Sequence, residues 1–109
     1  MSKKLFHQIT TELVERERRI RSEKREYLAS QLNLTESYLR KIHSPSTNKH
    51  YSLEHLYLLS LHWNINISHL IPSLSTLKLL PAYQNNSERE LEKIMNKIRE
   101  AFDCRFSGF

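Results

Sequence analysis

Apolar residues recur at helical spacing from the beginning of the chain. Residues 5–20 place five of them toward one side, with charged residues between them: Leu5, Phe6, Ile9, Leu13 and Ile20. Recurrence every three or four residues is typical of an amphipathic helix. We therefore expect one long helix over this range.

A second helix is expected to follow Ser22. Serine is a preferred N-cap residue, and Glu23 and Glu26 supply the negative charge that favours a first turn. Its buried side would consist of Tyr27, Leu28 and Leu32. The helix should end near Asn33, because asparagine is, after glycine, the residue that best tolerates the left-handed conformation at a helix end.

A third, short helix is expected behind Thr35, which can cap it. Leu39 and Ile42 would be buried, and Leu34 would pack just before the cap. The helix should stop before Pro45, because the residue that precedes a proline disfavours helical geometry. Such a short helix is unstable alone, so packing against its neighbours must hold it.

The next segment contains a loop and two further helical stretches. Residues 44–51, SPSTNKHY, have the Pro, Ser, Thr and Asn content of a loop. Ser52, with Leu53, Leu56, Leu59 and Trp63, then starts a helix that should end at Asn64. Residues 65–71 form a short helical segment closed by Pro72.

The end of the chain predicts one more amphipathic helix, over about residues 88–104. Residues 74–80 form an apolar turn or short helix before it. The sequence Ser87-Glu88-Arg89-Glu90 fits a capping box. An apolar stripe follows, formed by Leu91, Ile94, Met95, Ile98, Ala101 and Phe102. The sequence contains no alternation typical of strands, so we expect an all-α fold.

The charge is concentrated in the first half of the chain. The formal net charge is +5, and residues 1–51 hold eleven Lys or Arg against six Glu, which accounts for all of it. This asymmetry indicates a polyanionic partner, with DNA or RNA first and an acidic membrane surface second. The alternative is a solvated basic surface with no dedicated partner.

Several classes of protein are disfavoured by the composition. The only glycine is Gly108, which excludes glycine-rich loops that bind phosphates. No apolar run approaches the roughly 20 residues of a membrane span, and the amino end lacks the apolar core of a signal peptide. The single Cys104 permits no internal disulfide, as expected in a reducing compartment. We therefore expect a cytoplasmic protein.

Neither a metal site nor a catalytic set is expected. His55, His62 and His69 are spaced by seven residues, about 10.5 Å along a helix, which is too far for two of them to bind one metal ion. No nucleophile has a base beside it in the sequence. We expect that the chain is not an enzyme and needs no cofactor.

Two helices joined by a short turn, with the small Ala29 in the first, are typical of a helix-turn-helix. The stretches YLASQLNLTESYLRKIH and SLEHLYLLSLHWNINISHLI together resemble the lambda-repressor-like regulators, often called the Xre or Cro/C1 family. The resemblance covers about residues 13–72. It implies a five-helix DNA-binding domain over residues 1–72 that binds a pseudo-palindromic site as a homodimer, followed by an extension over residues 73–109.

The resemblance also implies which residues contact DNA. Four occupy the positions from which this family reads bases: Thr35, Glu36, Ser37 and Lys41. Lys41 could donate to guanine, Glu36 could accept from cytosine, and Thr35 or Ser37 could touch a thymine methyl or a phosphate. Flanking and phosphate contacts would come from Arg18, Lys24, Arg25, Tyr38, Arg40, Ser44, Thr47 and Lys49. For each of these residues, simple exposure on a solvated face is the alternative.

The chain departs from the family pattern in three places. The turn before the second helix lacks Gly-Leu-Thr, the loop after the third helix is longer and holds Pro45, and extra residues precede the first helix. These departures concern the DNA contacts more than the fold.

The C-terminal stripe has three interpretations. It can fold back on its own domain, pair with a second chain, or bind another protein such as an antagonist or a toxin. Two half-sites on DNA require a dimer, so pairing through Leu91, Ile94, Met95, Ile98 and Phe102 is favoured.

The function expected from all this is a nucleoid-associated transcriptional repressor that binds a palindromic operator. The alternative is a protein-interaction module with a helix-turn-helix shape, acting as an antitoxin, anti-repressor or phage inhibitor. RNA binding comes third, because the exposed aromatic sheet and glycine-rich loop of the common RNA modules are absent from the sequence.

Overall fold

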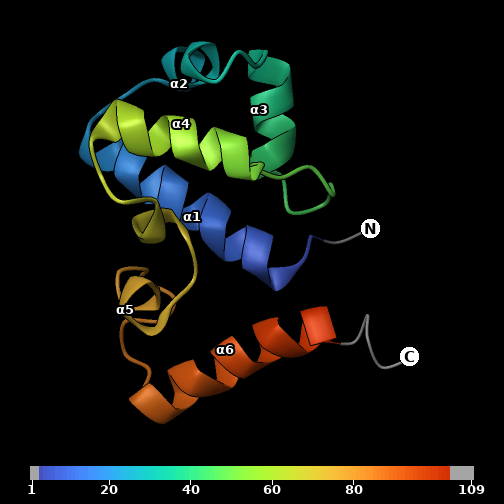
Figure 1. Ribbon diagram of the computed structural model, residues 1–109, viewed down its shortest axis with the longest axis vertical. Helices are drawn as coiled ribbons and strands as arrows, with labels where there is room; N and C mark the ends of the chain where they lie inside the picture. The colour runs from blue at the N-terminus through green and yellow to red at the C-terminus, as the bar shows by residue number, and fades with distance from the viewer. Residues whose placement is uncertain (1–2, 104–109) are drawn as a thin grey trace.

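Helices make up all regular secondary structure of residues 3–103, the part of the chain that the computed structural model describes (Figure 1). The expected all-α fold is confirmed. The elements are α1 (Leu5–Ile20), α2 (Arg25–Gln31), α3 (Glu36–His43), α4 (Leu53–Trp63), the 3₁₀ helix η1 (Ile67–Leu70), α5 (Leu74–Leu77) and α6 (Glu88–Asp103). The long first helix has the bounds that the hydrophobic pattern predicted.

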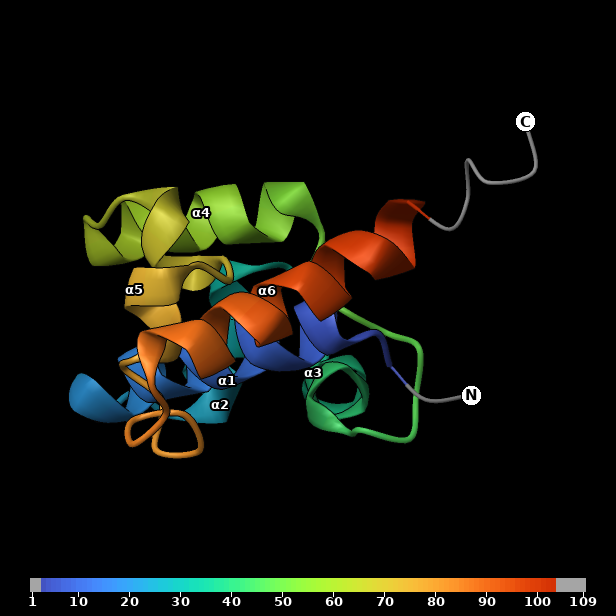
Figure 2. The same cartoon turned by 90° about the horizontal axis from the view of Figure 1, so that it is seen from below.

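Helix α1 runs between two groups of helices. In Figure 1, α2, α3 and α4 lie above it, and α5 and α6 lie below it. Seen from below, α6 crosses α1 obliquely (Figure 2). Each group buries its apolar side chains against a different side of α1, so this helix belongs to two hydrophobic cores.

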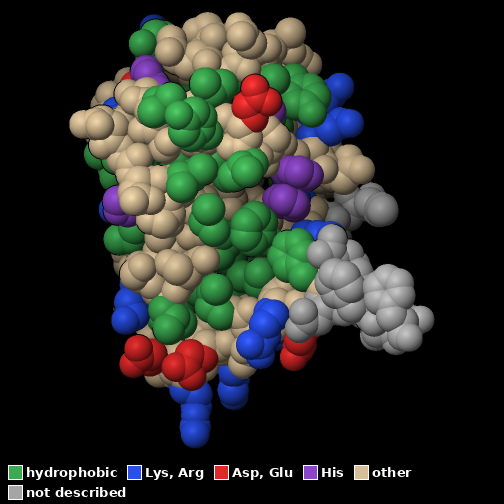
Figure 3. Space-filling model, viewed as in Figure 1, with side chains coloured by type: hydrophobic (Ala, Val, Ile, Leu, Met, Phe, Trp, Pro, Cys, Tyr) green, Lys and Arg blue, Asp and Glu red, His purple; other side chains and the backbone are tan. Residues whose placement is uncertain are grey.

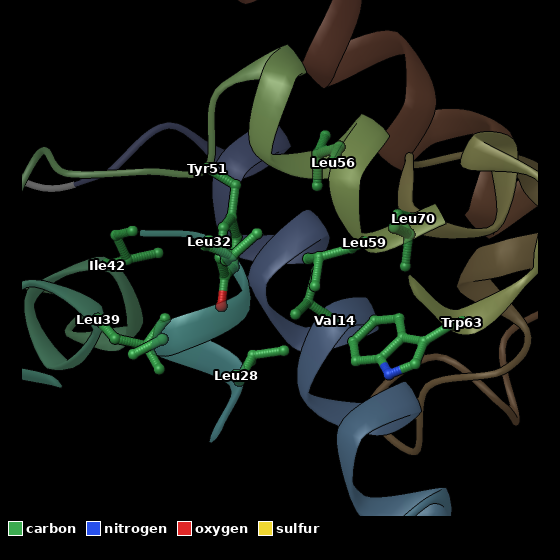
Figure 4. Close-up of a cluster of buried hydrophobic side chains, with 11 residues drawn as sticks. Val14, Leu28, Leu32, Leu39, Ile42, Tyr51, Leu56, Leu59, Trp63 and Leu70 are labelled. Carbon is green, nitrogen blue, oxygen red and sulfur yellow. The ribbon is translucent and has the colours of Figure 1, made fainter. Parts of the chain in front are cut away.

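The upper core joins α1 to the helices predicted to form the DNA-binding unit. Val14 is its contribution from α1 (Figure 4). The other members are Leu28, Ala29, Leu32, Leu39, Ile42, Tyr51, Leu56, Leu59, Trp63 and Leu70. Removing this much apolar surface from water is what holds the short α2 and α3 in place.

The lower core joins α1 to the C-terminal extension. Its buried members are Ile9, Leu13, Leu77, Leu80, Leu91 and Ile98. Ile94, Met95 and Phe102 pack against it, and the Phe102 ring lies edge-on to Phe6 with 5.8 Å between the centroids. In the structure the stripe of α6 therefore packs against its own chain, with Leu91 and Ile98 buried in the lower core. Pairing of two chains through this stripe stays a prediction.

Three helices end on a left-handed residue although no glycine is used. Ser22, Asn33 and Asn64 have φ of 54°, 55° and 53°. Behind each helix the same two backbone hydrogen bonds close the turn; at Asn33 they run from Asn33 N to Ser30 O (3.3 Å) and from Leu34 N to Ala29 O (2.9 Å). This is a Schellman motif. The predicted roles of Asn33 and Asn64 are confirmed.

The predicted role of Ser22 is wrong. Ser22 ends α1 and does not cap α2, which begins later with Lys24 as an N-cap that makes no side-chain cap bond. Glu23 has a tertiary role instead. Its carboxylate accepts a hydrogen bond of 3.1 Å from Trp63 Nε1 and lies 3.1 Å from His62 Nε2, which ties the α1–α2 turn to the end of α4.

The remaining predicted caps are present. The side chains of Thr35 and Ser52 accept hydrogen bonds from the amides of Tyr38 and His55. The capping box at Ser87 is also formed, because Ser87 N donates to Glu90 Oε1 (2.8 Å) and Glu90 N donates to Ser87 Oγ (3.2 Å).

Three large apolar residues of the predicted helical patterns are exposed: Ile20, Tyr27 and Leu53. Each lies in the first or last turns of its helix, where the chain leaves the core and a helical spacing no longer implies burial. None of the helices in residues 3–103 combines the length and apolar composition needed to cross a membrane.

Candidate nucleic-acid interface

The candidate interface is built on the α2–turn–α3 unit. Helix α2 packs against α3, and the small Ala29 of α2 is buried in the upper core at 3% exposed. The left-handed Asn33 ends α2 and turns the chain, and Thr35 caps α3 two residues later. The turn therefore fixes the direction of α3 relative to α2.

Helix α3 is anchored by one side only. Leu39 and Ile42 are fully buried in the upper core, and Tyr38 packs partly against it. The opposite side consists of exposed residues: Thr35, Glu36, Ser37, Arg40 and Lys41. All four residues predicted to read bases are thus exposed and lie together on one face, and Arg40 lies among them.

Two of these side chains interact with each other. Arg40 Nη1 lies 3.5 Å from Glu36 Oε1, and both side chains are about half exposed. A pair of this kind contributes little to stability, because water screens it. Either partner can therefore exchange this contact for a ligand at small energetic cost.

A carboxylate on α1 organises the basic residues near the start of α2. Glu15 accepts hydrogen bonds from Arg18 Nε (2.7 Å) and from Arg25 Nη2 (3.1 Å), and Arg19 Nε lies 3.3 Å away. The hydrogen bond from Arg18, with further contributions from Arg25, lowers the pKa of Glu15 to about 2. Glu15 is therefore ionised and holds Arg25 at the start of α2.

Arg18 and Arg25 differ in their availability to a ligand. The Arg18 side chain is 16% exposed, and its guanidinium bonds both Glu15 and the backbone oxygen of Glu23. The Arg25 side chain is 43% exposed, so much more of it is accessible to a ligand. Lys24, which precedes it, is exposed as well.

The loop after α3 is held by hydrogen bonds despite its length. The Thr47 hydroxyl donates to Lys41 O, and Ser44 N donates to the same oxygen (3.2 Å). These bonds satisfy a carbonyl at the end of α3, which has no partner inside the helix. Ser44 and Thr47 are half-buried, whereas Lys49 is exposed.

The far end of this loop is fixed by His43 and Tyr51. His43 Nε2 and Tyr51 Oη lie 2.5 Å apart, and Tyr51 is buried in the upper core. Burial lowers the pKa of His43 to about 4 and raises the pKa of Tyr51. Both groups are therefore neutral at pH 7, and the loop is closed by a neutral hydrogen bond between them.

Comparisons with protein families, with curated proteins and with solved structures found no match for the chain. Its function must therefore be argued from the arrangement of its own residues.

The sequence did not reveal Glu15, His43 and Tyr51 as residues that shape this surface. For Glu15 a local signal existed, because Arg18 and Arg19 follow it by three and four residues, the spacing of helical ion pairs. The contacts of Glu15 with Arg25 and of His43 with Tyr51 join different elements. A contact between different elements cannot be predicted from the spacing of residues within one of them.

Proposed function

We propose that this chain is a sequence-specific DNA-binding transcriptional regulator, acting as a repressor that occupies a palindromic operator as a homodimer. The observation that carries the proposal is α3, a helix anchored on one side by Leu39 and Ile42, with Glu36, Ser37 and Lys41 exposed on the other. A helix held in this way has the shape required to enter a major groove, which is wide enough for one.

The exposed side chains of α3 supply the chemistry for reading bases. The Lys41 ammonium can donate to O6 and N7 of guanine, and the Glu36 carboxylate can accept from N4 of cytosine. Ser37 can donate or accept. The Thr35 hydroxyl already accepts from Tyr38 N, and its own hydrogen is available to a base edge or a phosphate.

Phosphate contacts would flank α3. Lys24 and Arg25 lie at the start of α2, where the helix dipole also favours an anion. Ser44, Thr47 and Lys49 lie in the loop behind α3, and Arg40 and Tyr38 lie on its flanks. Arg18 is the weakest of the predicted contacts, because its guanidinium is occupied by Glu15 and Glu23.

The test is selection of bound sequences from a random double-stranded DNA pool, followed by mobility shifts with the selected sequence. A palindromic consensus bound far more tightly than random DNA is the expected result. Affinity should also fall steeply with salt, at a log-log slope of about −0.9 per phosphate contact. Failure to enrich any sequence, or binding that does not respond to salt, would contradict the proposal.

Two lysine variants separate base reading from phosphate binding. Lys41→Ala should relax specificity at one base pair, with about 1–3 kcal/mol less discrimination there. Lys24→Ala should weaken binding to all sequences alike and reduce the salt slope by about 1 per half-site. Lys97→Ala, an exposed lysine on α6, is the control and should change neither property.

A further inference from the structure

Helix α4 presents an unusual surface to solvent. Leu53, Tyr57 and Leu61 are 73%, 56% and 61% exposed, and Leu58 beside them is 36% exposed. Spacings of four residues place the first three along a single ridge of the helix. We call these four residues the α4 ridge. Figure 3 shows hydrophobic side chains gathered over this face of the molecule, with few charged side chains among them.

The segment that carries the α4 ridge holds few charged residues, although Glu54 is exposed on the same side of α4, four residues before Leu58. Residues 52–86 contain only Glu54 and Lys78 as charged residues, whereas α1 and α6 present many Lys, Arg and Glu side chains to water. A partner that covers the ridge must therefore bring an apolar surface that also carries little charge. A second copy of the same ridge satisfies this requirement.

The spacing of the ridge also makes it complementary to itself. Leu53 and Leu61 are each four residues from Tyr57. In an antiparallel pair of α4 helices with a two-fold axis at Tyr57, each Leu53 lies opposite the Leu61 of the other copy. Packing of ridges with a spacing of four is the commonest way in which two helices cross, at an angle of about −50°.

We infer that two copies of this chain associate through the α4 ridge, with the two-fold axis at Tyr57. This inference rests on the proposed function, because the dimer would serve to present two α3 helices to the two halves of a palindromic operator. This two-fold axis is perpendicular to α4 and runs from α2 toward α6 in Figure 1. Rotation about it leaves both copies of α3 at the same end of the dimer. The stripe on α6 is already used within the chain, so it does not compete for this role.

The α4 ridge is small for a protein–protein interface. A stable interface buries roughly 800 Å² on each partner, and one helix with four exposed large side chains supplies only part of that area. We therefore expect a dimer that dissociates at about micromolar concentrations. Binding to adjacent half-sites would then stabilise the dimer on DNA.

The first test measures self-association without DNA by sedimentation equilibrium. Wild-type protein should be dimeric at about 100 μM, and Leu61→Lys should raise the dissociation constant at least about tenfold. The matched control is Ile20→Lys, which places the same charge on an α1 residue that is also 61% exposed and should leave dimerisation unchanged. Unchanged circular dichroism shows that each variant is folded.

The second test locates the axis. In a Cys104→Ser background, Tyr57→Cys should form a disulfide-linked dimer under a mild oxidant, because a residue on the axis meets its own copy. Leu53→Cys with Leu61→Cys should cross-link more rapidly than either single variant. Ile20→Cys in the same background should remain monomeric on a non-reducing gel.

Three results would overturn the inference: a wild-type chain that stays monomeric, dimerisation of Leu61→Lys equal to the wild type, or no cross-link at residue 57. The first result would leave the ridge to a different protein partner. A chain that stays monomeric yet still binds the selected DNA would refute the α4 dimer and leave the sequence-specific DNA binding of the proposed function standing. A chain that dimerises through the α4 ridge but does not bind DNA would support the α4 dimer and contradict the proposed function.

Discussion

The carboxylate of Glu15 on α1 lies 3.1 Å from the guanidinium of Arg25, the first residue of α2. This contact fixes the start of the helix-turn-helix unit on α1, and the Arg18 guanidinium, with its Nε 2.7 Å from the other oxygen, completes it. A single acid on α1 thus sets where the unit begins. Its low pKa makes this contact dependent on pH in a defined direction.

Glu15→Gln should lower stability at neutral pH and have less effect in acid. The pKa of Glu15 is 4.5 when unperturbed and about 2 in the folded chain. The stabilisation from the carboxylate is therefore fully present above about pH 4.5 and is lost as the pH falls toward 2. After allowance for the partial exposure of Arg25, we expect a loss of about 1–2 kcal/mol at pH 7.

Urea unfolding of both proteins at pH 7 and at pH 3 measures this difference. Glu92→Gln, at an exposed position on α6, is the matched control and should have little effect at either pH. An equal loss for Glu15→Gln at both pH values would show that the carboxylate charge is not the cause.

The correct and incorrect sequence predictions differ in how local their causes are. Thr35 caps α3 and Asn33 ends α2 through hydrogen bonds with residues close in sequence, so their residue types were sufficient. Ser22 shows the limit. Serine is a preferred N-cap and disfavours the left-handed conformation, so its residue type predicts a helix start, whereas in the structure it ends α1.

The candidate nucleic-acid interface could also be predicted only where its causes are local. The exposure of Glu36, Ser37 and Lys41 follows from the spacing of the buried Leu39 and Ile42. The engagement of Arg18 by Glu15 and Glu23 could not be foreseen in full, because Glu23 lies beyond the end of α1. The stripe of α6 has the same spacing whether it packs within a chain or between chains.

Ser22→Gly should stabilise the protein. Ser22 has a φ of 54°, a conformation that is unfavourable for a residue with a Cβ atom and freely accessible to glycine. We expect a gain of about 1 kcal/mol, seen as a rise in Tm of about 4–8 °C. Ser22→Ala retains the Cβ atom and should give no gain. If alanine stabilised as much as glycine, backbone strain would not be the explanation.

Two neighbouring threonines on α1 should respond in opposite ways to substitution by valine. Thr10 is 2% exposed, and its hydroxyl has no hydrogen-bond partner among residues 3–103. The hydroxyl of Thr11 donates to His7 O at 2.8 Å. Thr10→Val should therefore stabilise by about 1 kcal/mol, and Thr11→Val should destabilise by a similar amount. Thermal unfolding of both variants provides the comparison, and a loss on Thr10→Val would indicate an internal water at its hydroxyl.

Ile98→Ala should destabilise the folded monomer itself. Ile98 is 6% exposed and packs in the lower core with Ile9, Leu13 and Leu91. Truncation of such a side chain removes buried surface and leaves a cavity, which costs about 2–4 kcal/mol. The measurement belongs in the Leu61→Lys background, where the α4 ridge should no longer pair. Lys97→Ala, the exposed neighbour on α6, should cost less than about 0.5 kcal/mol. If the stripe of α6 paired between chains instead, the loss on Ile98→Ala would vanish at low protein concentration.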